Sequence, residues 1–150
     1  NLHMNIKLQS IARRKIDAEA REELFSGEVT VTEGLQGDCR TTIVAGEVSV
    51  LSKESWVKVC HEIGTELPWL AHGSNLLIKG FEFLPTDLGK TICIGEAQFE
   101  ITGELDPGLE LNFREPELYE ALQQGWRGGV VCKVLRSGNI QSGDDVDISG

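Results

Sequence analysis

The segment TICIGEAQFEITG, residues 91–103, decides the fold class of this chain. Apolar and polar side chains alternate through residues 91–94 and again through 97–103, which is the period of a half-buried strand. Gly95 and Glu96 separate the two runs, and a two-residue spacer of this kind predicts a β-hairpin. An isolated hairpin is marginal in water, so the sequence must supply partner strands.

Further short apolar runs on both sides of the hairpin supply these partners. Turn residues separate the runs, and Ser52 is a candidate N-cap for a helix that ends at Gly64. Residues 17–24, rich in Ala and Glu, are expected to form a helical turn or an exposed loop. About eight short strands with two short helices predict a mainly β fold, a closed or nearly closed β-barrel. The expected strands cover 5–12, 28–32, 45–51, 76–78, 130–135 and 146–148, and the second helix covers 115–123.

The chain has 150 residues, which fits a single domain. We interpret residues 1–3 as additions ahead of a natural start at Met4, so the expected domain covers 4–150. Hydrophobic residues make up 40% and charged residues 25%, an ordinary globular composition.

The net charge of the chain restricts the classes of partner that we expect it to bind. Asp and Glu number 24 against 14 Lys and Arg, which gives a net charge of −10. A protein that binds nucleic acid or an anionic membrane needs a basic surface, so we expect neither as a partner.

The sequence also bears on location. We find no apolar run of about 18 residues and no leader pattern, and we expect a cytoplasmic protein with reduced thiols.

The four cysteines are widely spaced, and no C-x-x-C pair suggests a zinc site. Cys60 and Cys132 share apolar faces of a helix and a strand, which predicts buried and inert thiols. Cys93 points opposite to its apolar neighbours, and its burial is left open. Cys39 lies between Asp38 and Arg40 in a turn, where Arg40 favours a thiolate and Asp38 opposes it. Cys39 is therefore a catalytic candidate, with an incidental surface cysteine as the competing interpretation.

The sequence contains no G-x-S-x-G, P-loop, H-E-x-x-H or G-x-G-x-x-G motif. His72 lies in the loop 69–75 between an expected helix and strand, where binding groups often sit. Asn75, at the end of that loop, can offer two donors and an acceptor. The acidic turn at 144–147 lacks the glycine and final glutamate of a calcium loop, so we predict no metal site.

Several segments, taken in order, resemble the MOSC family, which is named after the C-terminal part of molybdenum cofactor sulfurase. The resemblance is to its small stand-alone bacterial form and covers about residues 4–148. The most specific segment is Trp126-Arg127-Gly128-Gly129 followed by a strand. The others include GLQGD (34–38), VSVLS (48–52), LPW (67–69), NLLIKG (75–80), GELDP (103–107) and GDDV (143–146).

The resemblance implies a β-barrel like the small barrel domain of pyruvate kinase. It also implies sulfur-carrier or molybdenum-cofactor chemistry, with a cysteine desulfurase or a molybdoenzyme as partner. The family's cysteine after the Asp-Pro step takes up sulfur or meets the metal, and nearby arginines hold the pterin phosphate.

The chain departs from this pattern at the implied site. Gly108 stands in place of the cysteine, Glu110 stands among the residues that are usually basic, and Glu47 replaces an arginine. Glycine cannot carry a persulfide. The ligand-binding residues expected at the barrel mouth are Asp38, Arg40, His72, Asn75, Asp106, Arg127 and Gly128.

Two functions remain open at this point. In the first, the site is degenerate, and the domain binds a small anion or a partner protein without being an enzyme by itself. In the second, Cys39 substitutes for the missing cysteine, and the domain is an active sulfur carrier or binds molybdopterin. The sequence does not identify the oligomeric state.

Overall fold

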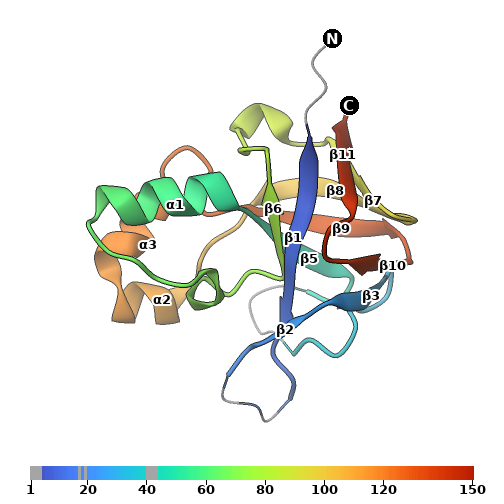
Figure 1. Cartoon of the computed structure of the whole chain (residues 1–150), viewed down its shortest axis with the longest axis horizontal. Coiled ribbons are helices and arrows are strands. Elements are labelled where there is room, and N and C mark those ends of the chain that lie inside the picture. The colour runs from blue at the N-terminus through green and yellow to red at the C-terminus, as the bar shows by residue number, and fades with distance from the viewer. Residues whose placement is uncertain (1–4, 17, 19, 40–43) are drawn as a thin grey trace.

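The computed structural model describes residues 5–16, 18, 20–39 and 44–150. Figure 1 shows a barrel of strands with a group of helices on one side of it. The strands are β1 (Ile6–Arg13), β2 (Glu22–Leu24), β3 (Ser26–Thr30), β4 (Gly34–Leu35), β5 (Glu47–Ser52), β6 (Leu76–Lys79), β7 (Thr91–Ile94), β8 (Ala97–Glu104), β9 (Val130–Arg136), β10 (Gly138–Gln141) and β11 (Asp145–Ser149). The helices are α1 (Lys53–Glu62), α2 (Leu109–Arg114) and α3 (Pro116–Leu122), with 3₁₀ turns η1 (Trp69–Ala71) and η2 (Pro85–Asp87).

Seven strands close the barrel in the order β1-β11-β7-β8-β9-β5-β6, with β6 pairing back onto β1. The pairing of Ile6 with Val146 joins the two ends of the chain and completes the ring. Only β5 and β6 run parallel within this ring, with Val50 opposite Leu76. A parallel pair needs a crossover connection, which α1 and the loop after it supply. The sequence predicted a mainly β fold with a closed or nearly closed barrel; the mainly β barrel is confirmed, and the structure shows that it is closed.

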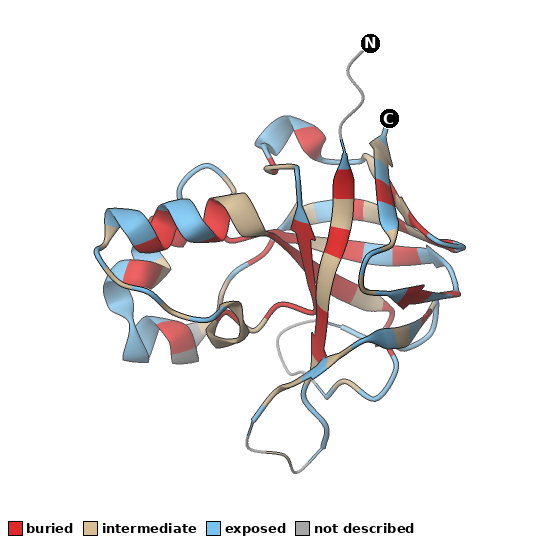
Figure 2. Ribbon diagram, in the orientation of Figure 1, coloured by how far each residue is buried: buried red, intermediate tan, exposed pale blue. Residues whose placement is uncertain are grey.

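The barrel is filled by one face of each strand, as Figure 2 shows by the alternation of buried and exposed positions along the ribbon. In the β7–β8 hairpin, Ile92, Ile94, Phe99 and Ile101 are fully buried, as their period predicts. Burial of each such side chain contributes about 1.5–3 kcal/mol. The strands β5 and β9 continue this sheet, so the hairpin and its predicted neighbours form one sheet system.

The helices cover the outer face of β5 and β6 (Figure 1). Leu51 and Leu77 alternate with interior neighbours and point outward into a second apolar cluster. Helix α1 begins as predicted, because the Ser52 side chain accepts a hydrogen bond from the Ser55 N–H at 3.2 Å. The other members of this second apolar cluster are Trp56, Val59, Cys60, Leu111, Leu118, Ala121 and Leu122. None of the helices in the described part of the chain is long and apolar enough to cross a membrane.

Three elements differ from the sequence-based expectation. The stretch expected as a helical turn or exposed loop contains β2, which pairs with β1 so that Leu24 lies opposite Ile11. Helix α2 spans only six residues, too few to show a helical period, and Pro116 starts the next helix. Strand β10 forms a small second sheet with β3 and β4. Short elements of this kind are stabilised by tertiary pairing, which local sequence does not reveal.

Candidate functional site

Asn75 is the centre of a buried polar network at the start of β6. Its side chain is fully buried, and its Oδ1 accepts hydrogen bonds from the Ser49 N–H at 3.1 Å and the Ser49 hydroxyl at 3.3 Å. Its Nδ2 donates to the Ala12 carbonyl at 3.3 Å and to Asp38 Oδ2 at 3.1 Å. Asn75 therefore ties β1, β5 and β6 to the loop that carries Asp38.

The loop after β4 docks on the end of β1 through Asp38 and Cys39. Asp38 Oδ1 accepts a hydrogen bond from the Arg14 N–H at 2.8 Å, and the Cys39 N–H donates to the Arg14 carbonyl at 2.7 Å. These bonds fix the backbone of Cys39, while its side chain is exposed. Arg40, the remaining candidate in this loop, lies outside the described residues.

The Asp-Pro-Gly step follows β8 and leads into α2. The Asp106 carboxylate accepts hydrogen bonds from the Gly108 N–H at 2.9 Å and from the Tyr119 hydroxyl at 3.0 Å. Gly108 has a φ of +98°, and a Cβ built there meets no heavy atom of the described residues within 4 Å, chain neighbours aside. A side chain at position 108 would therefore enter open space, although the backbone there favours glycine.

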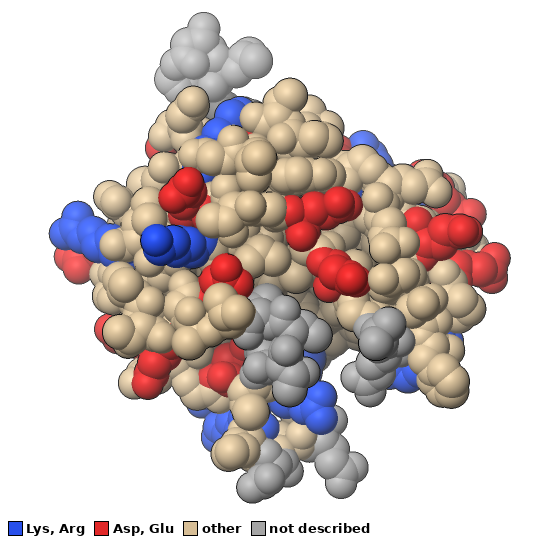
Figure 3. Space-filling model, turned by 180° about the vertical axis from the view of Figure 1, so that it is seen from behind, with Lys and Arg blue, Asp and Glu red and all other residues tan. Residues whose placement is uncertain are grey.

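Acidic groups dominate the surroundings of this step. Partial burial raises the pKa of Glu104, and the negative charge of Asp106 adds to the rise. The hydrogen bond to Asp106 likewise raises the pKa of the Tyr119 hydroxyl. On the face opposite to that of Figure 1 as a whole, Asp and Glu side chains lie on either side of a hollow (Figure 3). The side chain of Glu110 lies outside the described part of the structure.

Arg127 lies in the loop after α3 and contacts both α1 and α3. Its Nη1 forms an ion pair with Glu62 at 2.6 Å, and its Nη2 donates to the Ala121 carbonyl at 2.8 Å. The hydrogen bond from Arg127 lowers the pKa of Glu62. Arg127 therefore joins α1 to the end of α3, and Glu62 already balances its charge.

Gly128 connects the two parts of the candidate site. It is buried, and a Cβ there would lie 3.3 Å from Pro107 Cγ and 3.2 Å from the Leu122 carbonyl oxygen. The next residue, Gly129, contacts the Val50 backbone, one residue beyond Ser49 of the Asn75 network. The Asp38–Asn75 group and the Asp106–Gly128 group thus approach the same strand, β5, from opposite sides.

His72 lies in the same loop as Asn75 and is buried. Its ring meets Trp56 edge to face, with 5.6 Å between the ring centroids and 84° between the planes. This packing places His72 against α1.

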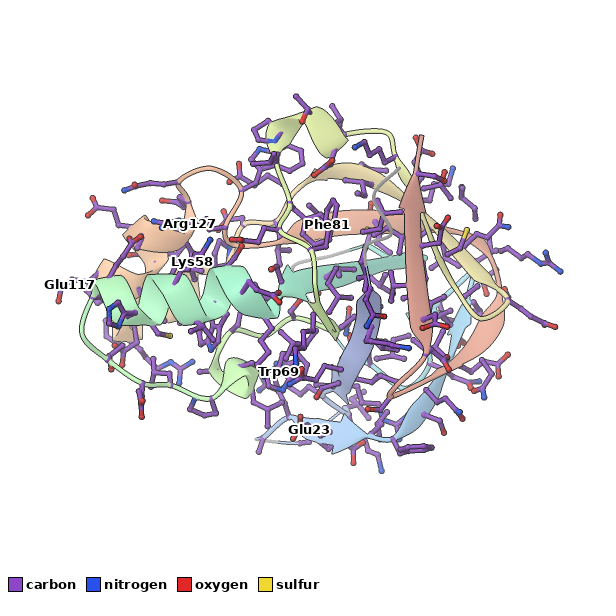
Figure 4. All side chains as sticks on the ribbon, turned by 45° about the horizontal axis from the view of Figure 1, so that its top comes forward. Glu23, Lys58, Trp69, Phe81, Glu117 and Arg127 are labelled. Atoms are coloured by element: carbon purple, nitrogen blue, oxygen red, sulfur yellow. The ribbon has the colours of Figure 1, made fainter. Side chains whose placement is uncertain are left out.

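A set of side-chain contacts between the β2 segment and the η1 loop was not predicted from the sequence. Arg21 donates hydrogen bonds to the carbonyls of Leu70 and Ser74 and lies over the Trp69 ring at 5.7 Å. Trp69 Nε1 donates to Glu23 Oε2 at 2.9 Å, and Figure 4 shows these two side chains together. Arg21 directly precedes β2 and Glu23 lies within it, but a strand of three residues is too short to be distinguished from a charged loop in the sequence.

Ser49 and Tyr119 were also missed as site residues. A serine between Val48 and Val50 in a buried strand is a signal that could have indicated an internal hydrogen-bond partner. Tyr119 carries no such signal, because its partner Asp106 is 13 residues away in the sequence.

Within the described residues, no group of three or more His, Cys, Asp or Glu side chains is arranged to hold a metal ion.

The burial of the cysteines predicts their order of alkylation in the native protein. Cys60 and Cys132 are 6% and 0% exposed, and burial raises the pKa of both thiols, so both should react slowly. Cys39 is exposed and should react first, followed by the half-buried Cys93. A peptide-resolved time course with iodoacetamide measures the order, and denatured protein, in which all four should react, is the control. Alkylation of Cys132 before Cys39 would contradict the strand assignment.

A comparison of the sequence with protein-family models finds a match. The family model described as MOSC domain matches residues 36–147. This range contains every site residue that was predicted from the sequence. A search of curated proteins finds no match.

Solved structures support the fold over the whole chain. The YuaD protein from Bacillus subtilis superposes with a TM-score of 0.79 at 18% identity, covering 98% of this chain and 97% of that protein. YiiM from Geobacillus stearothermophilus gives 0.74 at 20% identity, covering 97% and 75% of the two chains. YiiM from Escherichia coli gives 0.67 at 14% identity, covering 100% and 71%. At these identities the likeness concerns the fold.

Proposed function

The chain belongs to the MOSC domain family, and from this we propose that it is a MOSC domain with a degenerate site, one that binds a partner protein, or a small anion only weakly, and carries no persulfide. The observation that carries the proposal is Gly108, which stands where the family resemblance places the sulfur-accepting cysteine. The loop around it is held in place, because the Asp106 carboxylate accepts hydrogen bonds from the Gly108 N–H and the Tyr119 hydroxyl. A side chain at position 108 would project into open space, but glycine provides no thiol there.

The residues present do not fit the molybdenum cofactor. Position 108 offers no sulfur ligand, and the neighbouring carboxylates of Asp106 and Glu104 would repel a phosphate. Arg127, the best remaining anion contact, already pairs with Glu62. Loss of one charge-assisted contact costs about 1.5–3 kcal/mol, or about ten- to a hundredfold in affinity. We therefore expect dissociation constants of about 1 mM or weaker for inorganic phosphate, measured by calorimetry.

An active sulfur carrier is the second candidate, and one observation favours it. Cys39 is exposed, its backbone is fixed by Arg14, and its neighbour Asp38 belongs to the Asn75 network. A cysteine desulfurase or a molybdoenzyme in the cytoplasm would then be the partner. This function requires a stable persulfide on Cys39.

Incubation with a persulfide donor, followed by mass spectrometry of intact protein and peptides, distinguishes the two functions. The parent chain should take up no sulfur at residues 106–108 or at Cys39, whereas Gly108→Cys should gain one sulfur on the new thiol. The positive φ of Gly108 adds about 1–2 kcal/mol of strain to any substitution. Gly108→Ala has the same strain without a thiol and is the matched control.

A second variant makes the assignment independent of position 108. The Cys39→Ala protein should take up no sulfur, like the parent. The double variant Cys39→Ala/Gly108→Cys should still gain one sulfur at position 108. A persulfide on Cys39 of the parent that disappears in Cys39→Ala would replace the degenerate-site proposal by the active one.

A further inference from the structure

Phe113 is the most exposed large apolar side chain in the described part of the chain, with 89% of its surface open to solvent. It lies on α2, which packs on the second apolar cluster through Leu111. Two residues correspond to about 200° around a helix, so Phe113 points away from the cluster that buries Leu111. The Phe113 ring therefore adds little to the core and is available for contact with another molecule.

Beside this helix lies an open hollow between α2 and α3, which we name the α2–α3 hollow. Its volume is about 390 Å³, and Asn112, which directly precedes Phe113, lines it from α2. Tyr119 lines it from α3, and the Tyr119 hydroxyl donates to the Asp106 carboxylate at 3.0 Å. A molecule in this hollow would therefore contact the residue that holds the Asp-Pro-Gly step of the candidate site. The other lining residues are Pro116, Glu117, Glu120 and Gln123.

The surface around Phe113 and the hollow is strongly acidic. Residues 104–120 contain six Asp or Glu and one Arg, a net charge of −5, which is half of the −10 of the whole chain. Glu115, Glu117 and Glu120 are exposed, and none of them forms an ion pair with another described residue. Glu117 lies at the outer edge of the helical layer, away from the barrel (Figure 4). Their charges are therefore available to a partner.

An exposed aromatic ring among unpaired carboxylates restricts the chemistry of the molecule that binds there. An acidic segment would be repelled, and so would a second copy of this chain, which itself carries −10. An arginine guanidinium can stack on an aromatic face while its N–H groups bind a carboxylate. An apolar side chain next to it would remove the Phe113 ring from water. The surface therefore fits a segment that combines both kinds of side chain.

We propose that Phe113 and the α2–α3 hollow bind a basic segment of a partner protein, in which Arg or Lys flanks an apolar side chain. The apolar side chain packs on Phe113, and the basic side chains pair with Glu117 and Glu120. This inference rests on the proposed partner binding and names the chemistry of the partner. Its test measures peptide binding, whereas the persulfide experiment tests Cys39 and position 108, so failure of one is distinguishable from failure of the other.

Three acetylated octapeptides are the probes, and they alternate Arg with Leu, Arg with Ser, and Glu with Leu. In a ¹H–¹⁵N NMR titration of the whole chain, the Arg-Leu peptide should shift amides within residues 106–123 and yield a dissociation constant. The Arg-Ser peptide has the same charge without the apolar side chains and should bind at least about fivefold more weakly. The Glu-Leu peptide should leave these amides unshifted, because its charges repel the surface.

The contribution of the aromatic ring is measured with Phe113→Ser. This variant should weaken binding of the Arg-Leu peptide at least about fivefold, as expected for loss of an aromatic anchor. Leu88→Ser is the matched control, because Leu88 is 57% exposed beside the η2 turn, and its affinity should equal that of the parent. Both side chains are exposed, so both variants should fold.

The contribution of charge is measured with the double variant Glu117→Gln/Glu120→Gln. It should weaken binding of the Arg-Leu peptide by about three- to tenfold, because both carboxylates are exposed to solvent. Glu28→Gln/Glu33→Gln removes the same charge from exposed positions at the small second sheet and should leave the affinity unchanged.

Four results would each overturn the proposal. They are no binding of the Arg-Leu peptide at about 1 mM, shifts located outside residues 106–123, equal binding of the Arg-Leu and Glu-Leu peptides, and an unchanged affinity in Phe113→Ser.

Discussion

The free energy of unfolding is expected to fall by about 3 kcal/mol or more when Gly129 is replaced by alanine. Gly129 has a φ of +99°, and an alanine Cβ would lie 2.5 Å from the Val50 carbonyl oxygen. That oxygen belongs to the backbone of β5, so relief of the clash requires movement of a strand. The Gly129 carbonyl also accepts a hydrogen bond from the Leu105 N–H, and the same movement would disturb β8.

Gly125→Ala is the matched control, because both glycines precede β9 in the same loop. Gly125 has a φ of +65°, but no heavy atom of the described residues, chain neighbours aside, lies within 4 Å of the position that an alanine Cβ would take. It should therefore lose only the conformational term, about 1 kcal/mol. Urea unfolding of both variants measures the difference. Equal midpoints would mean that close contact with β5 does not determine the glycine at position 129.

Asn75→Ala is expected to destabilise the protein by about 3–5 kcal/mol. The substitution leaves the Ser49 N–H and the Ala12 carbonyl without their side-chain partner in a buried site, and each such loss costs about 1–3 kcal/mol. It also releases Asp38 from β6. For a domain of this size, the melting temperature should fall by about 10 °C.

Two further asparagine variants test the cause of this loss. Asn139 is exposed on β10, and Asn139→Ala should change stability by less than about 0.5 kcal/mol. Asn75→Asp keeps the oxygen that accepts from Ser49 but places a second oxygen against the Ala12 carbonyl and the Asp38 carboxylate. It should be at least as unstable as Asn75→Ala at neutral pH. A stable Asn75→Asp protein would mean that the donated hydrogen bonds contribute little.

The elements with the strongest local patterns were determined by the sequence alone. The alternation in residues 91–103 and 130–135 identified β7, β8 and β9, and their inward faces followed from the same period. Ser52 and Gly64 marked the two ends of the α1 segment, because capping acts within one helical turn. The burial of Cys60 and Cys132 followed from apolar neighbours at the correct spacing.

The candidate site depended on contacts between residues far apart in the chain. Asn75 was named from the sequence, but its partners Ala12, Ser49 and Asp38 lie 63, 26 and 37 positions away. Arg127 was expected at the mouth as an anion contact, and the ion pair with Glu62 that balances its charge spans 65 positions. Hydrogen-bond partners at such separations leave no periodic signal in either segment.

Closure of the barrel and the formation of β2 and α2 were likewise decided by tertiary structure. The sequence left open whether the barrel closes, and the pairing of Ile6 with Val146 settles it by joining strands at opposite ends of the chain. Strand β2 contains three residues and α2 contains six, too few for their own hydrogen bonds to outweigh the entropy of ordering them. Contacts with β1 and with α3 stabilise β2 and α2, respectively. The hairpin and α1, by contrast, each show their periodic pattern within one continuous segment of sequence.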